Sequence, residues 1–222
     1  IYKEAKIAAA IASADKLFVI SHFKGHEMTG FGGAMKNLAM GCASRAGKNE
    51  MHSSVRPTVN PHLCTACGRC KISCDSNAIT ISKYANINQS CVGCAMCISA
   101  CPEHAISVDF NVSCDTLQQK IVEYAVAVHN HFKEVIYVNV LTSIVPACDC
   151  HGGNDAPLVH DIGFMSSTDP VAIDKASYDM VLKTAGKDVF QEKWQYLNPQ
   201  DSFNHAQKIG FGSLDYTLEI VK

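Results

Sequence analysis

Apolar and polar positions along the chain follow two periods, one typical of helices and one typical of strands. Residues 1–16 carry apolar side chains at helical spacing, which predicts an amphipathic helix. The apolar run 17–21 (LFVIS) predicts a short strand that leads directly into the polar, glycine-rich stretch 22–33. Residues 34–40 (AMKNLAM) then predict a short helix that ends at Gly41.

The same alternation returns in the second half of the chain. Residues 115–132 predict a long amphipathic helix. Residues 134–141 (EVIYVNVL) are almost wholly apolar, as expected of a strand that is buried on both faces of a parallel sheet. A further strand is predicted over residues 162–167.

Helix signals are strongest near the C-terminal end. Asp169 is placed to cap a helix whose first position is Pro170 and which ends at Gly186. One or two short helices are expected over 188–209, and residues 214–221 (LDYTLEIV) alternate as in a strand. Strands that alternate with helices predict an α/β domain with a mostly parallel sheet sandwiched by helices.

Between these two halves the hydrophobic pattern gives way to a cysteine pattern. Residues 64–75 (CTACGRCKISCD) and 91–102 (CVGCAMCISACP) both have the spacing C-x2-C-x2-C-x3-C. Bacterial ferredoxins with two 4Fe–4S clusters have this spacing. We therefore predict an inserted α+β domain of the bacterial ferredoxin type over 60–110, between the host segments 1–59 and 111–222.

The spacing also assigns the cluster ligands, because the fourth cysteine of each run binds the other cluster. The first cluster is predicted to bind Cys64, Cys67, Cys70 and Cys101. The second is predicted to bind Cys91, Cys94, Cys97 and Cys74. A four-cysteine zinc knuckle is the alternative, but it would leave half of these cysteines without a role.

Composition narrows the cellular setting. Eight of the 12 cysteines stand within the two runs, whereas disulfide scaffolds are usually small secreted chains, so we expect a reducing cytoplasm. No apolar run approaches the roughly 18–20 residues that cross a bilayer, and no signal-peptide pattern is present. The net charge of −2 implies neither nucleic acid nor a membrane surface as a partner.

Basic side chains gather directly after the first predicted strand, where open α/β sheets bind ligands. The group comprises His22, Lys24, His26, Lys36, Arg45 and Lys48. Beside a glycine-rich loop and a helix start, these residues predict a pocket for a small anionic substrate, with Lys24 and His26 as catalytic candidates. The alternative is a solvated basic face whose glycines only form turns.

A further metal site is a second hypothesis for the host segments. Cys148 and Cys150 stand two positions apart on a glycine-flanked loop, and thiolates with a histidine suit Zn or Fe. The predicted ligands are Cys42, His52, Cys148 and Cys150. Alternatively, these cysteines are small buried apolar residues.

Taken together, these motifs resemble one family along nearly the whole chain. The motifs are SHFKGHEMTGFGGAMKNLAMGCASRAGK, the two cysteine runs and CDCHGGNDAPLVHDIGFMSSTDPVAIDKAS. They resemble the iron–sulfur-centre proteins built on a widespread domain of unknown function, found mainly in anaerobic bacteria and archaea. The matching positions outside the runs are Lys24, His26, Gly30, Lys36, Asn37, Cys148, Asp149, Cys150, Asp155, Asp161, Asp169 and Asp174. The resemblance implies the cofactors and the fold but no substrate.

These observations predict a cytoplasmic redox protein. Two 4Fe–4S clusters would pass single electrons between a redox partner protein and a site in the host domain. Two alternatives remain open: an electron-carrier subunit that docks a larger oxidoreductase, and a metal-dependent non-redox enzyme with structural clusters.

Overall fold

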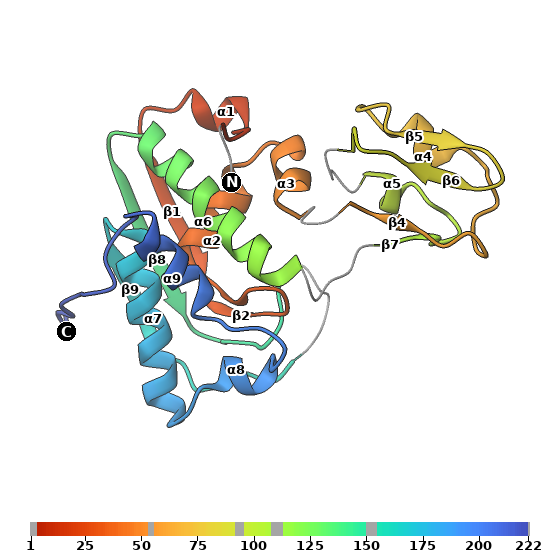
Figure 1. The fold of residues 1–222 in the computed structure, drawn as a ribbon. Coiled ribbons are helices and arrows are strands. Elements are labelled where there is room, and N and C mark those ends of the chain that lie inside the picture. The colour runs from red at the N-terminus through yellow and green to blue at the C-terminus, as the bar shows by residue number, and fades with distance from the viewer. Residues whose placement is uncertain (1–3, 53–55, 92–95, 108–112, 150–154, 222) are drawn as a thin grey trace. The chain divides into compact units, whose positions relative to one another are not determined.

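The chain folds into two compact units, each described here by itself (Figure 1). The computed structural model describes residues 4–52, 56–91, 96–107, 113–149 and 155–221. The host unit consists of residues 1–44 and 118–222, and the insert unit consists of residues 45–117. The insert unit extends beyond the predicted 60–110 at both ends, and it includes helix α3 (Arg45–His52).

A three-stranded sheet lies at the centre of the host unit, in the order β1 (Leu17–His22), β8 (Val135–Leu141), β9 (Gly163–Ser167). Strands β1 and β8 are parallel, whereas β8 and β9 are antiparallel. The unit is therefore α/β with a partly parallel sheet, rather than the mostly parallel sheet that we predicted. Strand β9 returns antiparallel because the described part of its connection to β8 contains no crossover helix.

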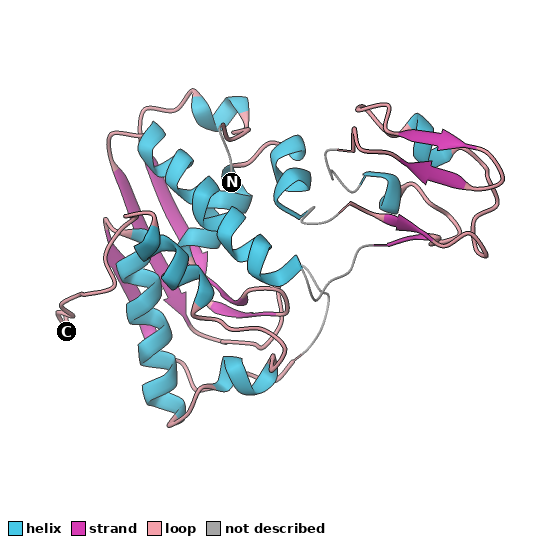
Figure 2. Cartoon of the chain, viewed as in Figure 1, coloured by secondary structure: helices cyan, strands magenta, loops and turns pink. Residues whose placement is uncertain are grey.

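Helices cover one face of this sheet (Figure 2). They include α6 (Ser113–His131) and α7 (Pro170–Ala185), which contacts β8 and β9. Helix α9 (Asp201–Lys208) packs on α7, and α8 (Val189–Lys193) packs on the short strand β3 (Gly30–Gly32). None of the described helices is long and apolar enough to span a membrane. The opposite face exposes Phe18 by 60%, Ile136 by 47% and Phe164 by 74%. Within the described residues the sheet is therefore not sandwiched, and β8 is not buried on both faces as predicted.

Local sequence signals position most host elements as predicted. Asp169 caps α7 by accepting hydrogen bonds from the backbone N–H groups of Val171 and Ala172, and Gly186 ends this helix at a φ of 73°. The predicted strands β1, β8 and β9 and the helices α6, α8 and α9 are likewise confirmed. The helix predicted at 34–40 begins as α2 (Ala34–Lys36) and continues as the π-helical turn η1 (Asn37–Gly41).

Two predictions at the ends of the chain are wrong. Of the described part of 1–16, only α1 (Ala9–Ala12) is helical, because Ile7 and Ala8 pair instead with the backbone of residues 42–43. Residues 214–221 form no strand. That segment is held by side-chain contacts instead, including a hydrogen bond of 3.0 Å from the Tyr216 hydroxyl to Asp179.

An aromatic cluster forms the centre of the host core, with ring centroids 5.1–6.0 Å apart. Its members are Phe23, Phe31, Tyr178, Phe190 and Phe203. Phe31 belongs to a hairpin of two short strands, β2 (Lys24–His26) and β3 (Gly30–Gly32), and Phe23 directly precedes it. Burial of these rings therefore anchors the glycine-rich stretch against the core beside the end of β1.

The insert unit is an α+β arrangement in which the two cysteine runs have equivalent surroundings. The first run contains helix α4 (Arg69–Ile72) and the second contains α5 (Met96–Ser99). Two antiparallel pairs of short strands flank them: β4 (Thr58–Val59) with β7 (Ile106–Ser107), and β5 (Ile79–Ile81) with β6 (Ala85–Ile87). Each pair joins a strand next to one run to a strand next to the other, so the two runs face each other.

Candidate functional site: a cysteine cavity and a polar pocket

Four cysteines of the insert unit line one cavity. Cys64, Cys67 and Cys70 come from the first run, whereas Cys101 ends the second run. Apolar side chains, among them Ile81 and Ile106, line the same cavity. The cavity thus brings together the four cysteines that the spacing assigned to a single cluster.

Backbone N–H groups donate hydrogen bonds to several of the cysteine sulfurs. They run from Ala85 to Cys64 at 3.4 Å, from Ala78 to Cys74 at 3.3 Å and from Ala105 to Cys101 at 3.3 Å. The last two bonds are equivalent, because in each run the donor stands four positions after the fourth cysteine. Donors aimed at sulfur stabilise thiolate, which is the form that binds metal.

The backbone of the first run is held in a conformation that few residues adopt. Ala66 has a φ of 55° and Gly68 a φ of 77°, both in the left-handed region. An L side chain pays roughly 1–2 kcal/mol there, so glycine is the usual occupant. The two turns let the neighbouring cysteines face the same cavity, and strain of this kind is often found at ligand sites.

Cysteines also make up much of the insert core. Cys70 and Cys97 are each only 6% exposed and pack with Ile79, Ala85 and Ile106. Burial raises the pKa of the Cys70 thiol, and the nearby thiolate charges of Cys64 and Cys101 raise it further. The raised pKa favours the neutral form of the Cys70 thiol unless a cation balances its charge, and a bound metal keeps its thiol ligands deprotonated.

The second predicted ligand set is described only in part. Cys74 packs against the apolar core that contains Cys97, and Cys91 is partly buried. Cys94 lies outside the described residues. Within the described ranges, no three His, Cys, Asp or Glu side chains are close enough to share a single metal ion. A 4Fe–4S cluster does not require such closeness, because each cysteine binds a different iron.

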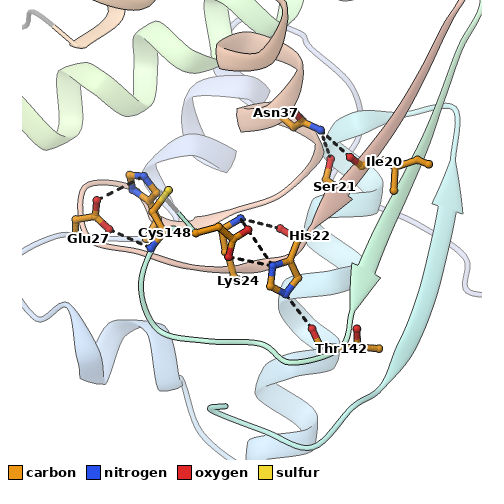
Figure 3. A network of polar contacts seen from close by, with 10 residues as sticks. Ile20, Ser21, His22, Lys24, Glu27, Asn37, Thr142 and Cys148 are labelled. Carbon is orange, nitrogen blue, oxygen red and sulfur yellow. Dashed lines mark hydrogen bonds and ion pairs between the residues drawn. The ribbon is translucent and has the colours of Figure 1, made fainter. Parts of the chain in front are cut away.

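A separate polar pocket of about 250 Å³ opens in the host unit at the carboxyl end of β1 (Figure 3). Strand β1 contributes His22, the hairpin contributes Lys24 and Gly32, and the following helical segment contributes Lys36. Asp149 reaches the pocket from the segment after β8. The pocket therefore lies where the sequence predicted ligand binding, at the edge reached by the strand ends.

Lys24, His22 and Asp149 form one network in this pocket. The Lys24 ammonium lies 2.7 Å from Asp149 Oδ2 and donates to the His22 carbonyl oxygen at 3.3 Å. The His22 ring faces Asp149 through Nδ1 at 3.1 Å and the Thr142 carbonyl oxygen through Nε2 at 2.9 Å. Partial burial acts to raise the pKa of Asp149, but hydrogen bonds from Lys24 and His22 outweigh it and hold that pKa below its ordinary value.

The start of the adjoining helix is already bound to a carboxylate. Buried Asp174 accepts hydrogen bonds from the N–H groups of Ala34 at 2.6 Å and Met35 at 2.9 Å, and from the Asn139 amide at 2.8 Å. A Cβ atom on Gly33 would lie 2.3 Å from Asp174 Oδ1, so only glycine allows this approach. The predicted role of the helix start in binding an external anion is therefore wrong for these N–H groups, and the lysines remain as partners for an anion.

The two catalytic candidates occupy different surroundings. Lys24 lines the polar pocket, whereas His26 does not, and its side chain is only 5% exposed. His26 Nδ1 accepts a hydrogen bond from the Met28 N–H at 3.1 Å, and its Nε2 lies 3.9 Å from Glu27 Oε1. Glu27 in turn accepts a hydrogen bond from the Cys148 N–H at 3.4 Å (Figure 3). His26 therefore lies in a second polar network, with Glu27 and the Cys148 backbone.

The remaining predicted residues are divided between the two units. Arg45, Lys48 and His52 belong to α3 of the insert unit. Cys42 and Cys148 are buried in the host unit, and Cys150 lies outside the described residues, so the additional Zn or Fe site stays a prediction. Burial raises the pKa of the Cys42 thiol, which favours the neutral form over a metal-binding thiolate.

Comparison with known proteins gives one family match. Residues 1–179 match the model of a family described as "Domain of unknown function (DUF362)". The match includes the polar pocket and both cysteine runs, and it ends within α7. No curated protein and no solved structure matches the chain.

Proposed function

Because the chain belongs to the DUF362 family, whose description specifies no reaction, we propose a function from its own residues. The chain is an iron–sulfur redox protein that passes single electrons through two 4Fe–4S clusters held in a bacterial ferredoxin-type insert. The main support is the cavity lined by Cys64, Cys67, Cys70 and Cys101, because its members come from both cysteine runs. A zinc knuckle built on neighbouring pairs would have no use for this combination.

The residues around the cavity fit a thiolate-bound cluster. Bound clusters would supply one-electron oxidation and reduction, with potentials set by hydrogen bonds to sulfur and by burial. The cysteines would bind iron as thiolates, and the Ala78 and Ala105 N–H groups would stabilise the added negative charge at Cys74 and Cys101. Ile81 and Ile106 would limit water access to the same cavity.

The polar pocket of the host unit is the destination that we propose for the electrons. It contains Lys24 and His22, and the side chain of each lies within hydrogen-bond distance of the Asp149 carboxylate. A pure carrier subunit needs no such pocket, so we favour electron transfer between a redox partner protein and this site in a cytoplasmic enzyme. The pocket side chains would bind and orient the substrate, and the clusters would deliver or accept electrons.

Metal and sulfide analysis of anaerobically purified full chain tests this proposal. The expected content is about eight irons and about eight acid-labile sulfides per chain, with a paramagnetic signal after reduction. Cys64→Ser and Cys101→Ser should each disturb the same cluster, although the two residues stand in different runs. Cys114→Ser, which removes a buried cysteine outside both runs, is the matched control and should retain the full content. Zinc without labile sulfide would contradict the proposal.

A further inference from the structure

The polar pocket contains more cationic groups than its one carboxylate can balance. Lys24 and Lys36 both line it, whereas Asp149 is the one acidic side chain among its described lining residues. Asp149 is paired with Lys24, and within the described residues Lys36 forms no ion pair. The pocket therefore retains an unbalanced positive charge next to an open volume of about 250 Å³.

The contacts of Asp149 indicate which chemical group Lys24 and His22 bind in this pocket. Its two carboxylate oxygens lie 3.1 and 3.2 Å from His22 Nδ1, and one of them lies 2.7 Å from the Lys24 ammonium. The recognising side chain is fixed, because Lys24 is only 13% exposed and also bonds to the His22 carbonyl oxygen. Asp149 is 51% exposed, so its carboxylate loses little by moving into water.

A second positive group, the Lys36 ammonium, belongs to the same pocket. Lys24 stands opposite Gly32 in the pairing of β2 with β3. A Cβ atom on Gly32 would lie 3.1 Å from the Lys36 Cδ atom, so the Lys36 stem passes directly over this glycine. Because Gly32 has no side chain, Lys24 and Lys36 can both line the same pocket.

From this arrangement we infer that the pocket binds a small dicarboxylate. One carboxylate of the ligand replaces that of Asp149 at Lys24 and His22, and the second pairs with Lys36. The inference deepens the proposed function by naming a substrate class, and it rests on that function only in calling the ligand a substrate. Binding itself requires no electron transfer.

Calorimetric titration of the anaerobically purified full chain with succinate tests the inference. Lys24→Met and Lys36→Met should each weaken binding about tenfold, the value of one moderately screened charge pair. Asp149→Asn should tighten binding about tenfold, because it removes the competing internal carboxylate while it keeps the side-chain shape. Lys16→Met is the control: it removes an exposed lysine that pairs with Glu134 outside the pocket, and it should leave the affinity unchanged.

The variants separate ligand recognition from a merely structural ion pair. If Lys24 and Asp149 only stabilise the fold, Asp149→Asn leaves succinate affinity unchanged or lower, and this result would overturn the inference. Equal affinity of the parent chain and Lys36→Met would overturn it as well. Lys36→Met changes a residue that forms no ion pair within the described residues, so it keeps the test informative if Lys24→Met fails to fold.

Iron and sulfide content, measured on the same samples, distinguishes failure of the inference from failure of the proposed function. Cluster-free protein that binds succinate with the expected variant pattern would support the inference and contradict the proposed function. Protein that contains the clusters but binds succinate independently of Lys24 and Lys36 would support the proposed function and contradict the inference. Acetate provides a further check, because its single carboxylate should bind through Lys24 and show no loss in Lys36→Met.

Discussion

The host unit and the insert unit build their cores from different kinds of side chain. The host core centres on stacked and tilted aromatic rings, among them Phe31, Tyr178 and Phe203. The buried cluster of the insert contains nothing larger than isoleucine, and two of its members, Cys70 and Cys97, are predicted metal ligands. Below about 70–80 residues, an apolar core rarely stabilises a fold without disulfides or metal. The host unit can therefore rely on apolar burial, whereas the insert would need the proposed clusters to be stable.

Removal of iron should have the largest effect and should separate the two units. In chain stripped of metal by anaerobic chelation, amides of residues 56–91 should lose nearly all protection from hydrogen exchange, because metal binding and folding are coupled. Protection in the host helices α6 and α7 should remain. Mass-spectrometric exchange on peptides from both units measures the difference. Full protection of the insert in the metal-free chain would show that its apolar core suffices.

A cavity in the aromatic cluster should have the opposite selectivity. Phe31 is 4% exposed and contacts Phe23, Tyr178 and Phe203, so Phe31→Ala should destabilise the host unit by about 3–5 kcal/mol. The single tryptophan, Trp194, lies in the host unit and reports its unfolding by fluorescence in denaturant. Phe18→Ala on the exposed sheet face is the control and should cost far less. Loss of iron from Phe31→Ala would indicate that the units depend on each other.

The pH dependence of host stability should come partly from Asp174. Burial raises the pKa of this carboxyl to about 6, despite the hydrogen bonds from Asn139, Met35 and Ala34 that act to lower it. A raised folded-state pKa means that the native chain binds the proton more tightly than the unfolded chain. Its contribution is therefore fully present below about pH 4 and is lost as the pH rises through about 6.

Asp174→Asn tests this assignment because asparagine does not titrate. Between pH 4 and 6.5 the parent host unit should lose about 2 kcal/mol of unfolding free energy relative to the variant, which is most of the full difference set by about two pKa units at 1.36 kcal/mol each. Trp194 fluorescence in denaturant at each pH measures both chains. Only the difference in slope matters, since the substitution also removes a hydrogen bond. Parallel curves would show that Asp174 stays ionised over this range.

Local signals in the sequence predicted most of the local structure of the host unit. Asp169, Pro170 and Gly186 bound helix α7: Asp169 acts through its capping carboxylate, and Pro170 and Gly186 act through their own backbone geometry. The cysteine spacing is likewise a local signal, and the cluster binding that it predicts, including the exchange of fourth ligands between the runs, stays a prediction. Ile136 was misjudged because an apolar run does not reveal whether its second face is covered.

Contacts between distant segments could not be predicted from the sequence. Lys24 and Asp149 come into contact only when β1 and β8 pair, and no sequence motif relates positions this far apart in the chain. The sequence therefore predicted a basic pocket but not the carboxylate that occupies it. The sequence indicates only weakly that Asp174 is buried. It stands beside Ile173 and near Ala176 on the apolar face of α7, and a carboxylate buried there requires hydrogen-bond partners.

The smallest expected effect concerns backbone strain at positive φ, a conformation adopted by a glycine in the host unit and by an alanine in the insert unit. In the host unit Gly186 has a φ of 73° with open space around its Cα, so Gly186→Ala should cost about 1 kcal/mol from backbone strain alone. In the insert unit Ala66 occupies the same region at 55°, and Ala66→Gly would relieve that strain. The relief should nevertheless change stability by less than about 0.5 kcal/mol, because glycine also gives the unfolded chain more freedom. Thermal melts of the cluster-loaded chain followed by visible absorbance measure this. A gain well above 1 kcal/mol would show that local strain, rather than cysteine ligation at positions 64 and 67, limits the stability of the insert.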